Sequence, residues 1–100
     1  MLPISLFRVA GASMEPGLRE RDLVVVETLS YLIRRPRAGE VVVARHPSTD
    51  VLIVKRIAEV QGQRYVLRGD NDRESSDSRV FGAVTRKMLV GRVLTVLRRT

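Results

Sequence analysis

The chain contains no cysteine and only one histidine among its 100 residues. The first absence excludes disulfides, thiol catalysis and cysteine-bound zinc, and a single imidazole cannot build a multi-histidine metal site. That imidazole, His46, precedes Pro47 in a turn pattern, so we interpret it as an ordinary loop residue. We therefore expect neither a metal ion nor an organic cofactor.

Aromatic residues and long apolar runs are also scarce. Only 4% of the residues are aromatic, so the core must be aliphatic, and few rings are available to stack on nucleic-acid bases. No apolar run approaches the roughly 20 residues that a membrane-spanning helix needs. The start, MLPISLFRV, lacks the charged beginning and apolar centre of a signal peptide. These features predict a cytoplasmic protein without a membrane anchor.

Acidic residues are too few to balance the basic ones, and the formal net charge is +7. Such a charge is typical of proteins that meet nucleic acid or another anionic partner. The arginines are nevertheless scattered, with local clusters only at 34–37 and 92–99. A solvated basic surface is the plainer interpretation, and a catalytically idle β-barrel that binds nucleic acid is an alternative of another class.

Short runs rich in valine, isoleucine and leucine alternate with turn residues along the whole chain, which predicts strands. These runs cover residues 4–9, 22–27, 40–45, 51–59, 63–68 and 87–97. Helical periodicity is weak, with one possible turn within 27–35. The pattern predicts one all-β domain over residues 1–100, built as a folded antiparallel sheet or partly open barrel of about six strands.

The strand VLIVKRIAEV, from Val51 to Val60, carries a lysine on an apolar row. Because side chains alternate faces along a strand, Lys55 lies between Ile53 and Ile57. A free lysine has a pKa near 10.4, and burial among aliphatic side chains can lower it by up to about 3–5 units. A neutral lysine can act as a general base. Alternatively, Lys55 lies at a sheet edge and reaches water, or it forms a salt bridge.

The stretch GASMEPGL, from Gly11 to Leu18, is an irregular loop between the first two expected strands. Ser13 follows two small residues that let a substrate backbone approach, and Pro16 and Gly17 then force a turn. A serine in such a loop presents its hydroxyl and its own N–H, which suits a nucleophile with an oxyanion donor. A solvated turn serine is the simpler alternative.

Taken in order, four motifs resemble those of the signal peptidase I family of Ser-Lys proteases. They are GASMEPGL, RAGEVVVARHP (37–47), VLIVKRI (51–57) and RGDNDRESSDSRVFGAV (68–84), followed by VGRV (90–93). The resemblance implies a small signal-peptidase-like catalytic core. It implies Ser13 as the nucleophile and Lys55 as the general base. It also implies an oxyanion hole made by the Ser13 N–H and other backbone donors, because Gly11 stands where some relatives carry a serine.

The resemblance implies supporting roles for further residues. Ser75 matches the serine whose hydroxyl orients the base, and Asp77 and Arg79 match a buried ion pair that holds this loop against the site. Other matched positions shape the turns around the site, namely Met14, Pro16, Gly69, Asp70 and Asn71.

The motif RHP before the lysine strand resembles the nickel-type superoxide dismutase maturation proteases. This resemblance implies a serine endopeptidase that removes an N-terminal propeptide from a nickel superoxide dismutase precursor. General processing of exported preproteins is the alternative within proteases, and a self-cleaving repressor-type protease is another. The cleavage site, the oligomeric state and the contacts of residues 29–33, with lipid, substrate or the core, do not follow from the sequence.

Overall fold

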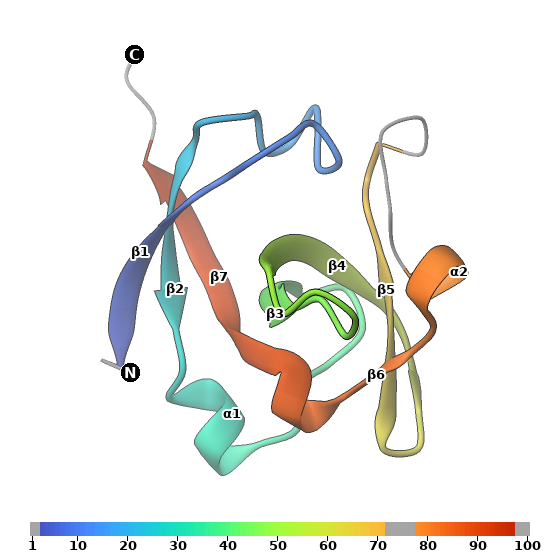
Figure 1. The fold of residues 1–100 in the computed structure, drawn as a ribbon. Coiled ribbons are helices and arrows are strands. Elements are labelled where there is room, and N and C mark those ends of the chain that lie inside the picture. The colour runs from blue at the N-terminus through green and yellow to red at the C-terminus, as the bar shows by residue number, and fades with distance from the viewer. Residues whose placement is uncertain (1–2, 72–77, 98–100) are drawn as a thin grey trace.

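The computed structural model of the chain describes residues 3–71 and 78–97 (Figure 1). Its strands form one antiparallel sheet in the order β1-β2-β7-β3-β4-β5-β6. The strands are β1 (Ile4–Arg8), β2 (Leu23–Glu27), β3 (Val41–Arg45), β4 (Leu52–Gln61), β5 (Arg64–Arg68), β6 (Val84–Thr85) and β7 (Leu89–Leu97). Between them lie α1 (Ser30–Ile33), α2 (Ser78–Phe81) and the 3-10 turn η2 (Arg86–Met88).

The predicted all-β fold is confirmed, with differences near the C-terminus. The expected strand over 87–97 begins instead as the turn η2, and β6 is a two-residue strand that pairs with β5. Two residues carry too little pattern to be recognised as a strand in the sequence. The single helical turn expected within 27–35 is present as α1.

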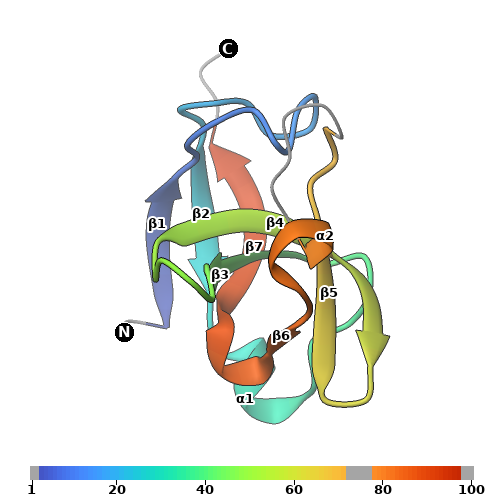
Figure 2. The same cartoon turned by 45° about the vertical axis from the view of Figure 1, so that its right-hand side comes forward.

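The central strand β3 is buried on both faces because the sheet curls around it (Figure 2). Its valine and alanine side chains alternate between two aliphatic clusters. Val42 and Ala44 pack with Ile57 and Leu67 in one cluster, while Val43 belongs to the other, which also contains Met14. A strand buried on both faces reads as a continuous apolar run, as VVVA does here.

Gly91 of β7 packs against the C-terminal end of β2. A Cβ built at this position would lie 2.8 Å from the carbonyl oxygen of Glu27 and 2.8 Å from Cγ1 of Val26. A backbone oxygen cannot turn away as a flexible side chain can. The absence of a side chain at Gly91 therefore permits β7 to pass this close to the end of β2.

We expect Gly91→Ala to lower the free energy of unfolding by about 1–3 kcal/mol, the usual range for overpacking a core. Gly17→Ala is the matched control, because a Cβ there would meet its nearest neighbour, the Met14 carbonyl oxygen, at an ordinary 3.7 Å. Urea denaturation of both variants would measure the difference. Equal stability of the two variants would show that β2 and β7 can separate at little cost.

Candidate active site

The loop that carries Ser13 joins β1 to β2 at one end of the molecule, and α1 and β6 lie at the other end (Figures 1 and 2). Met14 anchors this loop because its side chain is fully buried among the valines of the second cluster. The N–H of Leu18 donates to the Met14 carbonyl at 3.0 Å, which closes the turn. Gly11 has a φ of +79°, a conformation that residues with a side chain rarely adopt. Ser13 is thereby half-exposed next to a buried neighbour.

Lys55 lies inside the protein, with only 4% of its surface exposed. It pairs in register with Val42 of β3, so it lies on the face that Ile53 and Ile57 present to the first aliphatic cluster. The alternative that Lys55 lies at a sheet edge and reaches water is therefore wrong, because its side chain is buried. Burial among aliphatic side chains disfavours an ammonium group.

Ser13 and Lys55 line the same cavity, which has a volume of about 260 Å³. The first strand contributes Phe7, and the β3–β4 connection contributes His46. The remaining lining consists of small or aliphatic residues, namely Ala10, Gly11 and Ala12 of the serine loop, Val51 of the β3–β4 connection, and Leu52, Ile53 and Val54 of β4. The fold thus brings together two residues that are 42 positions apart in the sequence (55 − 13). A hydroxyl and an amine at one small apolar cavity are the groups that acyl transfer requires.

The segment from Gly69 to Asn71 ties the serine loop to the lysine strand. The backbone N–H of Asn71 donates to the Ser13 carbonyl at 2.7 Å, and its side-chain amide donates to the Ala12 carbonyl at 3.0 Å. Asp70 accepts two hydrogen bonds from Arg56, at 3.0 and 2.9 Å. Arg56 follows Lys55 in β4, so the ion pair connects the turn to the strand that carries the lysine. The three motifs are thus joined by hydrogen bonds.

We expect Asn71→Ala to lower kcat by about tenfold, because the Ala12 carbonyl loses its partner and the serine loop becomes less well positioned. The backbone bond to Ser13 survives this change, so the loss of stability should stay near 1 kcal/mol. Steady-state kinetics together with thermal unfolding would separate the two effects. An unchanged kcat would mean that the backbone bond alone positions Ser13.

The remaining predicted residues are placed only in part. Ser75 and Asp77 lie outside the described residues, so the orienting serine and the ion pair with Arg79 stay predictions. Arg79 itself is exposed at the start of α2. Pro16 is exposed in the serine loop, and Gly69 is buried. Within residues 3–71 and 78–97, no group of three histidine, aspartate or glutamate side chains is arranged to hold a metal ion.

The sequence interpretation missed the contribution of His46. The residue lies in the expected turn, where its Nδ1 accepts a hydrogen bond from the Ser48 N–H at 3.0 Å. Its ring also lines the cavity and packs edge-on against Phe81 of α2, with ring centroids 4.7 Å apart. The only indication of this location in the sequence is that His46 lies shortly before the strand that carries Lys55.

The fold and the cavity define a class of small β proteins that present a serine and a lysine together. The chain belongs to the family described as signal peptidase, peptidase S26, whose profile matches residues 1–67 and 58–97. A human protein named mitochondrial inner membrane protease subunit 1 is 30% identical over 105 residues, which cover 84% of this chain and 63% of the relative. A Synechocystis protein named probable signal peptidase I-2 is 27% identical over 129 residues, covering 84% and 58%. The chain therefore spans about three-fifths of the length of these relatives.

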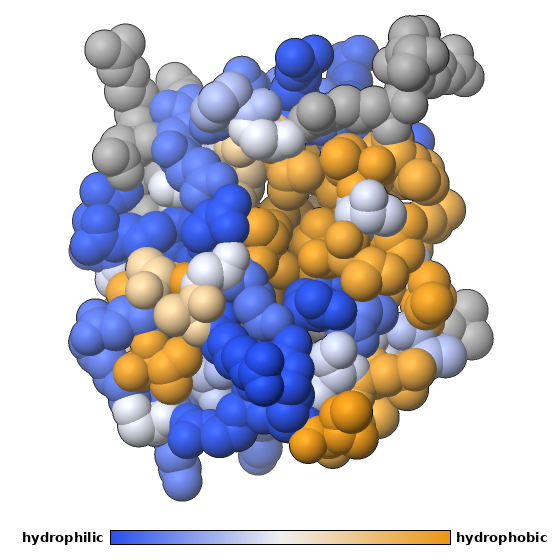
Figure 3. Space-filling model, turned by 180° about the vertical axis from the view of Figure 1, so that it is seen from behind, coloured by the Kyte–Doolittle hydropathy of each residue, from blue (hydrophilic) through white to orange (hydrophobic). Residues whose placement is uncertain are grey.

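These relatives overturn the prediction of a cytoplasmic protein. The human, mouse and frog relatives are named as subunits of a mitochondrial inner membrane protease, and an Arabidopsis relative bears a similar name. Their names favour association with a membrane. No helix among the described residues is long and apolar enough to cross a membrane. Apolar residues do gather on one side of the surface (Figure 3), and β1 and β7 carry exposed Ile4, Leu6, Leu94 and Leu97.

Proposed function

We propose that the chain is a serine endopeptidase that uses Ser13 as its nucleophile and Lys55 as its general base. The observation that carries the proposal is the cavity that the half-exposed Ser13 and the buried Lys55 line together. Membership in the peptidase S26 family supports the reaction type.

In the proposed mechanism, neutral Lys55 takes the proton of the Ser13 hydroxyl as its oxygen attacks the scissile carbonyl. The Ser13 N–H and neighbouring backbone donors stabilise the oxyanion. Lys55 then protonates the departing amine, which leaves an acyl group on Ser13. Finally, Lys55 deprotonates a water molecule that attacks the ester, and it returns this proton to the Ser13 oxygen as the acyl product leaves. The aliphatic surroundings of Lys55 favour the neutral amine that both proton transfers need.

For the substrate, we propose a precursor protein that loses an N-terminal propeptide, with a nickel superoxide dismutase precursor as the named candidate. This choice rests on the resemblance of the RHP motif at 45–47 to that of the dismutase maturation proteases. The position of His46 on the cavity supports a role for the motif in substrate contact. Processing of exported preproteins is supported by the name of the Synechocystis relative.

The two substrate classes can be separated by incubating the purified protein with a dismutase precursor and, in parallel, with an exported preprotein. We expect mass spectrometry to detect a single new N-terminus on the dismutase precursor. Cleavage of the preprotein alone would replace the first substrate class with the second. Failure to cleave either of them, in detergent as well as in buffer, would contradict the proposed activity.

We expect the cleavage rate to rise with pH between 5 and 9. Only the unprotonated amine of Lys55 accepts a proton, so the rate should increase about tenfold per pH unit below the pKa of Lys55 and then level off. The kcat/KM measured against pH on one peptide substrate would show this dependence. A flat profile over the whole interval would rule out a lysine base.

A further inference from the structure

A second cavity, of about 750 Å³, lies between α1, the β4–β5 hairpin and β6, at the end of the molecule opposite the serine loop. We call it the basic groove, and the residues that characterise it are Tyr31, Arg35, Arg64, Tyr65, Arg86 and Lys87. Among the residues that the structure describes, no acidic side chain lines the groove, although Glu40 lies behind Tyr31. Neither the family assignment nor the proposed reaction uses this groove.

The positive charge of the basic groove is largely uncompensated within the described residues. Arg34, also on its wall, is neutralised by Glu40 at 2.5 Å. Arg35 and Arg86 donate to the backbone carbonyls of Gly62, Leu89 and Tyr31, which leaves their net charge in place. Arg64 and Lys87 are exposed, and neither pairs with a carboxylate of the described chain. Four cations therefore face one hollow, an arrangement that attracts anions.

Aromatic and aliphatic side chains also line the groove, and the two tyrosines among them are held in place by burial. Tyr31 and Tyr65 are only 6% and 2% exposed, so they form a rigid floor. Arg34 and Arg86 lie over the Tyr31 ring, 5.7 and 5.4 Å from its centroid. Leu32 and Ile33 on α1 line the groove but remain 74% and 86% exposed. A ligand that combines carboxylates with aliphatic groups would match both the cations and these two side chains.

We propose that the basic groove binds an acidic segment of a partner protein in which carboxylate and aliphatic residues alternate. Guanidinium groups bind carboxylates through paired hydrogen bonds. Nucleic acid fits less well, because the tyrosine faces that would stack on bases are already buried or covered by arginine. A flat bilayer would leave the hollow itself unfilled. The inference is independent of the proposed peptidase activity.

The test uses a fluorescein-labelled octapeptide of alternating glutamate and leucine, with fluorescence anisotropy as the readout and Ser13→Ala protein to prevent cleavage. A peptide with glutamine in place of glutamate is the ligand control. We expect the glutamate peptide to bind about tenfold more tightly at low salt and the difference to shrink as salt is added. Equal affinity for the two peptides would overturn the proposal.

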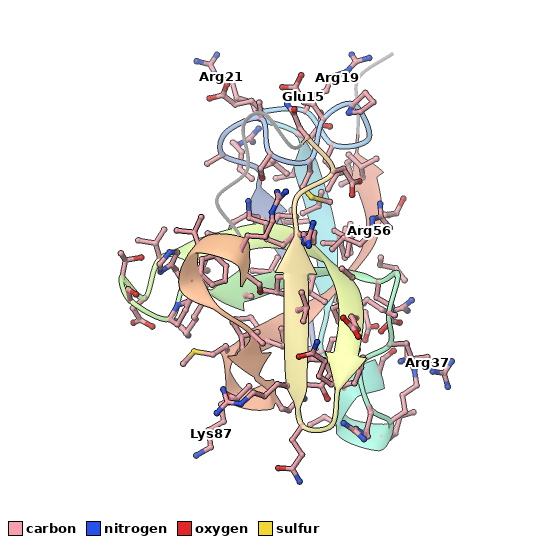
Figure 4. All side chains as sticks on the ribbon, turned by 90° about the vertical axis from the view of Figure 1, so that its right-hand side faces the viewer. Glu15, Arg19, Arg21, Arg37, Arg56 and Lys87 are labelled. Atoms are coloured by element: carbon pink, nitrogen blue, oxygen red, sulfur yellow. The ribbon has the colours of Figure 1, made fainter. Side chains whose placement is uncertain are left out.

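The location of binding is tested by two double variants that change the net charge equally. Arg64→Glu with Lys87→Glu alters the groove, whereas Arg19→Glu with Arg21→Glu alters the opposite end, where Figure 4 shows these two side chains. We expect about a tenfold loss of affinity in the first variant and little change in the second. Should the first variant fail to fold, Arg64→Gln with Lys87→Gln replaces it. Equal losses would show unspecific attraction and overturn the proposal.

The two alternative ligands of the groove, nucleic acid and a lipid membrane, are tested on the same protein variants. The two probes are a single-stranded oligonucleotide and vesicles that contain phosphatidylglycerol. If either probe binds more tightly than the glutamate peptide, and loses affinity in the Arg64→Glu, Lys87→Glu variant, that probe's class replaces the acidic peptide as the proposed ligand. We expect both probes to bind more weakly than the glutamate peptide.

Discussion

Ser13→Ala and Lys55→Met should each reduce cleavage of a peptide or precursor substrate by about 10⁴-fold or more. Groups that act as one unit in acyl transfer lose nearly all of their effect when either is removed. Methionine is a better replacement for Lys55 than alanine, since it keeps an unbranched chain in the aliphatic surroundings but has no amine. The rate of product formation, followed by mass spectrometry, would measure the loss.

Two control experiments test whether a loss of activity comes from misfolding or from the mere loss of a positive charge. Lys55→Met should remain folded, as thermal unfolding would show, because methionine fits the aliphatic surroundings that include Ile53 and Ile57. Arg37→Met, which removes an exposed cation that lines neither the Ser13 cavity nor the groove beside α1 (Figure 4), should leave the rate unchanged. Retention of more than a tenth of the activity in either the Ser13→Ala or the Lys55→Met variant would refute the proposed dyad.

The second large effect concerns stability, and we expect Arg92→Met to lower the free energy of unfolding by about 3 kcal/mol at pH 7. Arg92 on β7 donates to the buried carboxylate of Glu27 on β2 at 2.7 Å. Removing one member of a buried pair leaves an uncompensated charge, which usually costs about 3–5 kcal/mol. The lower end applies because Arg92 keeps some exposure, and because the Ser30 N–H still donates to Glu27.

The stability that the Glu27–Arg92 pair provides should decrease as the pH falls. Burial alone would raise the pKa of Glu27, but hydrogen bonds from Ser30 and Arg92 outweigh it and lower the pKa from 4.5 to about 2. A carboxylate with a lowered pKa stabilises the fold above about pH 4.5, and this stabilisation is lost as the pH falls toward 2.

The destabilisation by Arg92→Met should therefore shrink as urea denaturation is repeated from pH 6 down to pH 3. Thr95→Met, a nearby exposed position on β7, provides the matched control and should change stability little at any pH. A difference between Arg92→Met and the parent that stays constant with pH would exclude Glu27 as the group responsible.

Much of this protein follows from local pattern. The alternation of Val51 to Glu59 predicts both the strand and the placement of Lys55 between Ile53 and Ile57, since the faces of a strand repeat every second residue. The serine loop and the motif from Gly69 to Asn71 are likewise recognisable in the sequence. By contrast, the late start of the last strand, β7, and the existence of the two-residue β6 depend on pairing with distant residues. No local pattern encodes that pairing.

The residue types therefore define the all-β class, the aliphatic core and the candidate pair of Ser13 and Lys55. Tertiary structure decides that Lys55 is buried beside Val42 of β3, and that His46 lines the same cavity. It also decides that Arg56 binds Asp70, and that Arg64 and Lys87 share a groove with α1. The physical reason is that burial and charge pairing depend on distances between residues far apart in the chain. Those distances exist only once the sheet has curled and its strands have chosen their neighbours.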